Sequence, residues 1–435
     1  MDKICQQTFK RVQRKIKALK LRPYQEEIVK KGIEVLIPFR FLYLAMEVRT
    51  GKTITSLKLF TYMWAKLGIS PNGKRILFVT KKKAISSIEN DYDNSGCVYD
   101  IMITNYESLH KVPTKGWDAL ICDEAHCMGA FPKPSKRAKQ VKEIISRSKP
   151  YVVLLSGTPT PESYSQMYHQ VYAIPKNPFN SHKNFYSFSK RYVQVKQKKI
   201  GGNMINDYSH GTELILHHMK PYLISFTQKL AGFESTIDEE ILNVPLSIKA
   251  VNLIKKLKKD LVIQGKEEVI LADTGVKLMM KIHQLSSGTI KFESGNGMVV
   301  DYTKAYYIAD KFKNRKIAIF YKFVQELSAI VEVFGDNITT DLQEFDSSDK
   351  SIALQIVSGR EGISLKNAEC IVYYNIDFSA TSYWQSRDRM TTMQRKFSKI
   401  YWVFSNEGIE KQIYRAVVKK KDYTLTHFKR DLLSL

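Results

Sequence analysis

Short apolar runs separated by helix-like segments are the feature that most restricts how this chain can fold. In its first part these runs are FLYLAM (41–46), RILFVT (75–80), DIMITN (100–105), ALICDEAH (119–126) and YVVLLSGT (151–158). Strands that are almost continuously apolar are typical of a parallel sheet covered by helices on both faces. Strands that alternate with helices therefore predict an α/β unit.

The same rhythm returns later in the chain, with KIAIFYKF (316–323), IALQIVS (352–358), ECIVYYNI (369–376) and SKIYWVFS (398–405). Between the two parts, from about Pro161 to Asn243, the sequence is aromatic, basic and helix-like. Within it, IGGNMINDYSHG (200–211) is predicted to be a loop because of its Gly, Asn and Asp content. We therefore predict two α/β units with a mostly helical insertion between them.

Length and charge narrow the class of protein. With 435 residues and 43% hydrophobic residues, the chain is long enough for more than one domain and apolar enough for real cores. Its formal net charge is +25, and a surplus of this size favours a polyanionic partner, most simply nucleic acid. A solvated basic surface or a membrane-surface protein are the alternatives. The sequence contains no run of about 18 apolar residues, so no membrane span is predicted.

The N-terminus and the cysteines point to a reducing compartment. The first twenty residues lack the apolar core of a secretion signal. Five cysteines are few and odd in number, which fits the cytoplasm better than a disulfide framework. Cys122 and Cys127 flank a short motif, but no second Cys/His pair completes a zinc site, so no structural metal is expected.

The stretch MEVRTGKT (46–53) ends like a phosphate-binding loop, between an apolar run and an amphipathic run. The consensus G-x-x-x-x-G-K-[ST] has glycine where this chain has Met46. Lys52 is expected to reach the phosphates and Thr53 to bind Mg²⁺, while loop amides and the following helix N-terminus hold the phosphate oxygens. Because Met46, Val48 and Arg49 replace frequent glycines, the backbone must manage without glycine's freedom.

Two carboxylates follow an apolar strand in ALICDEAH, at the end of the strand where ligands bind in open α/β sheets. Asp123 is predicted to hold Mg²⁺ and Glu124 to orient or deprotonate an attacking water. An acid pair at a helix N-terminus is the plainer alternative. The combination of this strand with the Lys-Thr loop in one α/β unit favours a nucleotide site.

Several ordered motifs now resemble the superfamily 2 helicases, most closely the Swi/Snf-type branch and its compact phage relatives. They are LRPYQEEIV (21–29), RTGKT (49–53), ILFVTKKKAI (76–85), ITNYESL (103–109), CDEAH (122–126), LSGTPTPES (155–163), KIAIFYKF and VSGREGISLKNAECIVYYNIDFSATSYWQSRDRM (357–390). The resemblance spans roughly residues 20 to 405. It implies two RecA-like parallel-sheet lobes, 1–160 and 246–435, with the insertion and linker at 161–245.

The resemblance implies roles for individual residues. Gln25 is expected to read the adenine edge, which makes ATP the nucleotide. The residues expected around the nucleotide are Arg22, Gln25, Arg49, Thr50, Gly51, Lys52, Thr53, Gly362 and Arg389. Thr53 and Asp123 are expected to hold Mg²⁺, and Glu124 the water. His126, Ser156 and Thr158 are expected to couple the nucleotide to nucleic acid, and Gln385 to help complete the site.

One motif departs from the family pattern. Q-x-x-x-R-x-x-R would place a second arginine seven residues after Gln385, where this chain has Thr392. Arg389 is therefore the first candidate for an arginine that stabilises transition-state charge, with Arg395 or Arg387 next. Each also has an ordinary interpretation as a surface or packing residue, above all Arg387.

The expected nucleic-acid path is carried by backbone-contact candidates. These are Lys81, Lys82, Lys83, Asn105, Tyr106, Ser156, Thr158 and Ser364. Phosphate contacts of this kind confer affinity and salt dependence but read no sequence. The aromatic residues of FNSHKNFYSFSKRYVQ (179–194) could stack on bases as a strand separator, or form the core of the insertion.

The resemblance implies a monomeric, ATP- and Mg²⁺-dependent DNA helicase or translocase that remodels forks or Holliday junctions. Its setting would be phage-type replication, recombination or repair, in the cytoplasm of the cell or host, with other replication or recombination proteins as further partners. An RNA-directed helicase or transcription-termination NTPase is the alternative within the enzymes. A nucleic-acid-binding protein with an inactive ATPase site is the alternative of another class.

Overall fold

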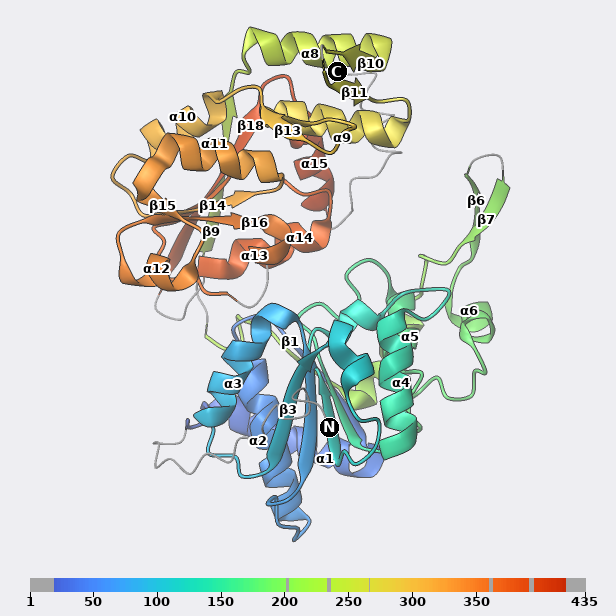
Figure 1. The fold of residues 1–435 in the computed structure, drawn as a ribbon. Helices are drawn as coiled ribbons and strands as arrows, with labels where there is room; N and C mark the ends of the chain where they lie inside the picture. The colour runs from blue at the N-terminus through green and yellow to red at the C-terminus, as the bar shows by residue number, and fades with distance from the viewer. Residues whose placement is uncertain are drawn as a thin grey trace, which may run out of the picture. The chain divides into compact units, whose positions relative to one another are not determined.

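The computed structural model describes residues 19–200, 203–232, 236–265, 267–359, 363–390 and 395–419. The chain divides into two compact units, Met1–Gly232 and Phe233–Leu435. Each contains one six-stranded parallel sheet (Figure 1). The prediction of two parallel α/β lobes is therefore confirmed.

The sheet of the first unit has the order β3-β2-β4-β5-β1-β8. Its strands are β1 (Phe41–Met46), β2 (Arg75–Thr80), β3 (Asp100–Asn105), β4 (Ala119–Cys122), β5 (Tyr151–Leu155) and β8 (Leu223–Phe226). The first three coincide with the apolar runs of the sequence. Every neighbouring pair is parallel, so all carboxyl ends lie along one edge, where the predicted motifs follow the strands.

Helices cover both faces of this sheet (Figure 1). The helices α1 (Pro23–Phe39), α2 (Lys52–Lys66) and α3 (Ile85–Asp93) share a core with Leu42, Leu44 and Phe78. On the opposite face, α4 (Lys136–Ser148) and α5 (Met167–Val171) pack with Tyr43 and Leu77. Successive strand residues thus feed two cores, which explains why the strands are apolar throughout.

The segment after β5 is helical as predicted, but it also contains a hairpin. The helices are α5, α6 (Phe185–Tyr192) and α7 (Leu214–Met219), and β6 (Lys196–Ile200) pairs antiparallel with β7 (Asn203–Asp207). The prediction of a loop over 200–211 is therefore wrong for part of that segment. The hairpin projects from the first unit in Figure 1. Phe179, Phe185, Phe188 and Tyr192 are buried, so these aromatic rings form core.

The sheet of the second unit has the order β15-β16-β14-β17-β18-β9, again with parallel pairs. Its strands are β9 (Thr236–Val244), β14 (Ile317–Tyr321), β15 (Ile338–Thr339), β16 (Ser351–Gln355), β17 (Cys370–Tyr373) and β18 (Phe397–Ser405). Trp402 on β18 is fully buried against Tyr373 of the neighbouring strand, with ring centroids 3.8 Å apart. This stack lies in the larger of the two cores that flank the sheet.

Helices and two small hairpins surround the second sheet. The helices are α8 (Ile248–Asp260), α9 (Gly275–Ser286), α10 (Thr303–Lys311), α11 (Val324–Phe334), α12 (Leu342–Ser347), α13 (Ile356–Gly359), α14 (Ala380–Arg387) and α15 (Glu410–Val417). The hairpins are β10 (Val262–Gln264) with β11 (Val269–Leu271), and β12 (Thr289–Lys291) with β13 (Gly297–Val299). Across the described ranges, no helix combines the length and apolarity that crossing a membrane requires.

The boundary between the units falls inside the segment predicted as insertion and linker. Its strand β8 extends the first sheet beside β1, and its strand β9 extends the second beside β18. The compact units therefore divide at Gly232 rather than on either side of a separate insertion.

Candidate active site

The turn between β1 and α2 has the backbone of a tight loop despite its missing glycines. Gly51 has φ +79° and precedes the first residue of α2, while Arg49 has φ +64° in the left-handed region. The Thr50 hydroxyl donates to the Glu47 carbonyl at 2.7 Å and closes the turn. The sequence therefore keeps glycine at one left-handed position and tolerates arginine at the other.

The start of α1 braces this loop. The Gln25 amide nitrogen donates to the Gly51 carbonyl at 3.3 Å and to the Thr55 hydroxyl at 3.2 Å, and its amide oxygen accepts from Arg22 N at 2.9 Å. Gly51 has a positive φ that favours glycine, and a Cβ there would lie 2.3 Å from the Gln25 nitrogen, so another residue would also displace the Gln25 amide. An adenine contact by Gln25 stays a prediction. To make it, the Gln25 amide would have to give up one of these hydrogen bonds.

The two predicted acids follow β4 directly. Asp123 Oδ2 accepts a hydrogen bond from the Thr80 hydroxyl at 2.8 Å, and the Tyr106 hydroxyl donates to the Asp123 carbonyl at 2.7 Å. Glu124 has φ +48°, so the chain turns sharply after Asp123. Sheet register explains the Thr80 contact, because Val79 of β2 is paired with Cys122 of β4.

His126 connects Glu124 to the segment after β5. Its Nδ1 lies 3.0 Å from Ser156 Oγ, with hydrogen-bond geometry, and 3.2 Å from Glu124 Oε2. Ser156 Oγ also accepts from the Thr158 amide at 3.1 Å. Apart from this contact with His126, Glu124 Oε2 is buried without a hydrogen-bond partner in the described part of the chain. A buried carboxylate oxygen in that state is costly unless a ligand or water satisfies it.

The two carboxyl groups have opposite pKa shifts. Burial, and then the negative charge of Glu124, raise the pKa of Asp123 to about 6, although Lys52 and Thr80 oppose the change. Burial also disfavours the charged form of Glu124, but neighbouring His126 and the charges of Lys52 and Lys81 hold its pKa below the usual value. Lys52 thus acts electrostatically on both acids, and a Cβ placed on Gly157 would lie 3.5 Å from its Nζ.

The structure brings Gln25, the loop, Lys52, both acids, His126 and Ser156 together at one edge of the first sheet. Thr80, which positions Asp123, was not predicted. It could have been found, because a polar residue ending a strand beside an acid-tipped strand lies next to that acid.

The predicted nucleic-acid-binding residues of the first unit differ in how exposed they are. Lys82 and Lys83 are exposed in a short turn after β2, and Lys81 is partly buried. Asn105 caps the next 3₁₀ turn by accepting from the Ser108 amide. The Tyr106 ring is 1% exposed, so its side chain supports Asp123 from within the core and does not form surface.

The arginine candidates lie in the second unit. Arg387 forms an ion pair with Glu239 at 3.0 Å and lies over the Trp384 ring, which is the packing role that the sequence left open for it. Arg389 is 7% exposed, and its guanidinium donates to the Ile363 carbonyl at 3.5 Å. The Arg395 guanidinium donates to the carbonyls of Lys366 and Glu369.

Other predicted residues of the second unit are only partly described. Ser364 is exposed in the loop between α13 and β17. Gly362 and Thr392 lie outside the described residues, and Gln385 is described in backbone alone, within α14.

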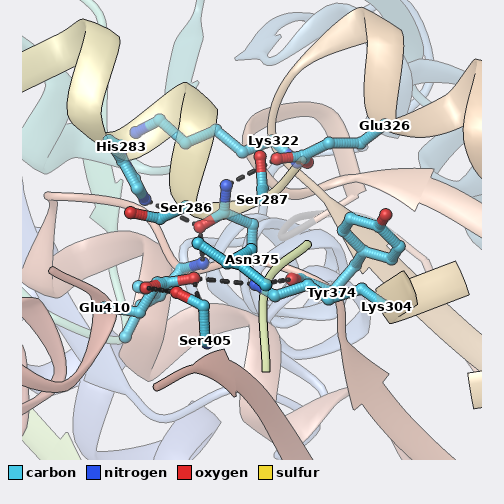
Figure 2. Close-up of polar contacts among 12 residues, drawn as sticks. His283, Ser286, Ser287, Lys304, Lys322, Glu326, Tyr374, Asn375, Ser405 and Glu410 are labelled. Atoms are coloured by element: carbon cyan, nitrogen blue, oxygen red, sulfur yellow. Dashed lines mark hydrogen bonds and ion pairs between the residues drawn. The ribbon is translucent and has the colours of Figure 1, made fainter. Parts of the chain in front are cut away.

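A buried polar network supports the carboxyl edge of the second sheet (Figure 2). His283 Nε2 lies 2.7 Å from Asn375 Oδ1, and Asn375 donates its side-chain nitrogen to Glu326 Oε1. Nearby, Lys322 is paired with Asp377, which also accepts from the Ser382 hydroxyl in the first turn of α14. These contacts fix the start of the helix that carries Gln385. No sequence pattern predicted these contacts, because the residues that make them come from distant segments.

Part of the chain is similar to a known protein family. Residues 75–286 match the model of the SNF2-related domain. The match begins after the phosphate loop, so the assignment of MEVRTGKT depends on its own residues and contacts.

Individual relatives are distant. PICKLE, a CHD3-type chromatin-remodeling factor of Arabidopsis thaliana, is 20% identical over 371 residues, which cover 78% of this chain and 26% of that protein. The SWI/SNF-related matrix-associated actin-dependent regulator of chromatin subfamily A-like protein 1 of Xenopus tropicalis is 22% identical over 395 residues, covering 80% of this chain and 39% of that protein. This chain thus spans well under half the length of either relative.

Among solved structures, the SWI2/SNF2 ATPase core of Sulfolobus solfataricus in complex with dsDNA is similar to this chain. The TM-score is 0.43 with 16% identity, over 96% of this chain and 93% of that one.

Proposed function

We propose that this chain, whose residues 75–286 match the model of the SNF2-related domain, is a DNA-dependent ATPase that uses hydrolysis to translocate on and remodel DNA. The observation that carries the proposal is the convergence of Lys52, Asp123 and Glu124 at one sheet edge. There, Lys52 acts electrostatically on both acids, and the buried Glu124 Oε2 lies 3.2 Å from His126 Nδ1. A group in that state is suited to hold a water for attack on a phosphate.

The residues present fit a magnesium ion. Thr53 lies in the first turn of α2 and Asp123 follows β4, and hydroxyl and carboxylate oxygens are the ligands that Mg²⁺ prefers beside phosphate oxygens. When bound, Mg²⁺ would neutralise developing charge on the phosphoryl oxygens. Thr53 and Asp123 would hold it, and its charge would also favour the ionised form of Asp123.

The chain's own residues would carry the remaining steps in the first unit. Lys52 and the N-terminus of α2 would bind the phosphates. Glu124, whose pKa is below its usual value, would stay ionised at neutral pH and orient the water. His126 would transmit changes at Glu124 to Ser156 and Thr158, through the contacts that already join them.

We also propose nucleotide-site roles for Arg389, Gly362 and Gln385, as the family resemblance implies, with Arg389 stabilising transition-state charge. Arg389 keeps the arginine position of the motif, four residues after Gln385, whereas Arg387 forms an ion pair with Glu239. To reach a phosphate, the Arg389 guanidinium would have to exchange contacts that include its hydrogen bond to the Ile363 carbonyl.

DNA is the proposed partner because of the +25 net charge and the exposed Lys82 and Lys83 beside the site. The finer proposal is remodelling of branched DNA, such as forks and four-way junctions, in phage-type replication or recombination. It is supported by analogy with the compact phage relatives that the motifs resemble.

Steady-state ATPase rates measured with different nucleic acids test the proposal. The panel is no nucleic acid, single strands, duplex, fork, four-way junction and RNA. We expect stimulation by DNA, with the largest rate on branched forms if the finer proposal holds. Stimulation by RNA alone would replace DNA by RNA as the track. A near-zero rate throughout would contradict the proposed activity and leave a binding protein.

A further inference from the structure

The segment that leads out of the first unit passes directly across the phosphate loop. Strand β8 pairs with β1 so that Phe226 lies opposite Met46, the last residue before the loop. The Glu47 amide then donates to the Phe226 carbonyl at 3.0 Å. We call residues 226–228 the strap. The unit ends at Gly232, four residues beyond it, so the strap is part of the connection to the second unit.

Side chains tie the strap to the loop at further points. The Gln228 amide donates to Glu47 Oε2 at 2.7 Å, and the Gln228 side-chain nitrogen donates to the Val48 carbonyl at 3.0 Å. The Phe226 ring stacks on Tyr24, with centroids 4.8 Å apart and planes 17° from parallel. Tyr24 in turn donates its hydroxyl to the Thr50 carbonyl at 3.2 Å.

These contacts fall on the part of the loop that lacks glycine. They hold residues 47, 48 and 50, on both sides of Arg49 with its φ of +64°. A non-glycine residue in the left-handed region persists only where its surroundings fix the backbone. The strap and Tyr24 supply that constraint, and Glu47 supplies a charge-assisted hydrogen bond.

We propose that the strap is part of the nucleotide site: Glu47 and Gln228 are positioning residues that hold the loop in its phosphate-binding conformation. This rests on the function proposed above. Because binding and positioning are linked, a nucleotide on the loop also stabilises the strap. Nucleotide binding at the phosphate loop is thereby coupled to the segment that leads toward the second unit. The coupling runs through hydrogen bonds that lie within the first unit.

The test measures binding of a fluorescent N-methylanthraniloyl ADP with Mg²⁺ to the full chain. Glu47→Ala removes the acceptor for the Gln228 amide, and we expect roughly tenfold weaker binding. Glu47→Gln retains an acceptor oxygen and should bind within about threefold of wild type. Gln228→Ala removes the bond to Val48 and should fall between the two. Glu34→Ala, at an exposed position of α1, is the matched control and should bind like wild type.

Amide hydrogen exchange separates positioning from general destabilisation. In wild type, ADP should slow exchange in the peptide that contains Gln228, and in Glu47→Ala this protection should be lost while strands β2 and β4 keep theirs. Equal affinity of Glu47→Ala and wild type, or strap exchange that ignores ADP, would overturn the proposal. If wild type binds no nucleotide, or Lys52→Ala binds as well as wild type, the function proposed above fails first.

Discussion

At the scale of single residues, Arg49 shows how this loop differs from the consensus. It has φ +64°, a conformation that an L-residue with a Cβ adopts at a cost of about 1 kcal/mol or more. The loop keeps the conformation because Thr50, Tyr24 and Gln228 bind the carbonyls around it. The missing glycine is therefore compensated by neighbours rather than by a different backbone.

Replacing Arg49 tests that interpretation. Arg49→Gly and Arg49→Ala remove the same side-chain contacts, but only glycine relieves the left-handed conformation. We expect Arg49→Gly to be more stable than Arg49→Ala by about 1 kcal/mol in urea unfolding of the first unit. Equal stabilities would show that the positive φ carries no cost here.

His169 on α5 makes a second prediction at this scale. Burial lowers the pKa of His169 to about 4, and its Nδ1 donates to the Ala130 carbonyl at 2.6 Å. Between pH 6.5 and about 4 the unfolded state binds more protons at this residue, so its contribution to stability is lost as the pH falls.

The test compares wild type with His169→Gln at pH 7 and pH 5. The difference between their free energies of unfolding should narrow at pH 5, by on the order of 1 kcal/mol. The variant acts as the control for all other titrating groups. A difference that stays constant between the two pH values would contradict burial of the neutral imidazole.

The residues that the sequence could predict were those tied to strand ends. Lys52 and the two acids lie together because parallel strands align their carboxyl ends. Their partners could not be predicted in the same way. Glu47 and Gln228 meet because strand β8, far along the chain, returns beside β1.

At the scale of elements, long apolar strands were predictable and polar edge strands were not. Strand β9 has the sequence TIDEEILNV, and its acids are accommodated because it lies at the edge of its sheet and pairs with β18 alone. Lys399 of β18 binds Asp238 and also Glu240, which lies 2.9 Å away. Because an edge strand tolerates charged residues, β9 lacks the continuous apolar pattern by which the central strands were recognised.

The short helix α15 depends on a buried ion pair. Glu410 in its first turn lies 2.7 Å from Lys304 of α10, and both side chains are almost fully buried (Figure 2). Ser405 also donates its hydroxyl to Glu410 Oε2 at 2.9 Å. Removing one partner leaves the other charge buried and unpaired.

We expect Glu410→Ala to destabilise the second unit by about 3–5 kcal/mol. The double variant Lys304→Met with Glu410→Leu should recover at least half of that loss, because no charge stays buried. The loss in Glu410→Ala and the recovery in the double variant are measured by urea unfolding, together with peptide-level hydrogen exchange in α10 and α15. A double variant no better than Glu410→Ala would refute the buried-charge explanation.

At the scale of the whole molecule, the net charge of +25 predicts strongly salt-dependent binding to DNA. The logarithm of the association constant should fall linearly with the logarithm of salt concentration, by about 0.9 per phosphate contacted. Lys82→Ala with Lys83→Ala should reduce the slope by up to about 1.8. Lys66→Ala, exposed at the far end of α2, is the control and should leave the slope nearly unchanged.

The most direct test of the central claim is the duplex-stimulated ATPase rate of wild type, Lys52→Ala and Glu124→Gln. We predict that duplex DNA raises the wild-type ATPase rate by at least about tenfold. Each variant should still bind DNA, but its duplex-stimulated rate should be at least about a hundredfold below that of wild type. Full hydrolysis by Glu124→Gln, which removes the carboxylate proposed to orient the attacking water, would contradict the account.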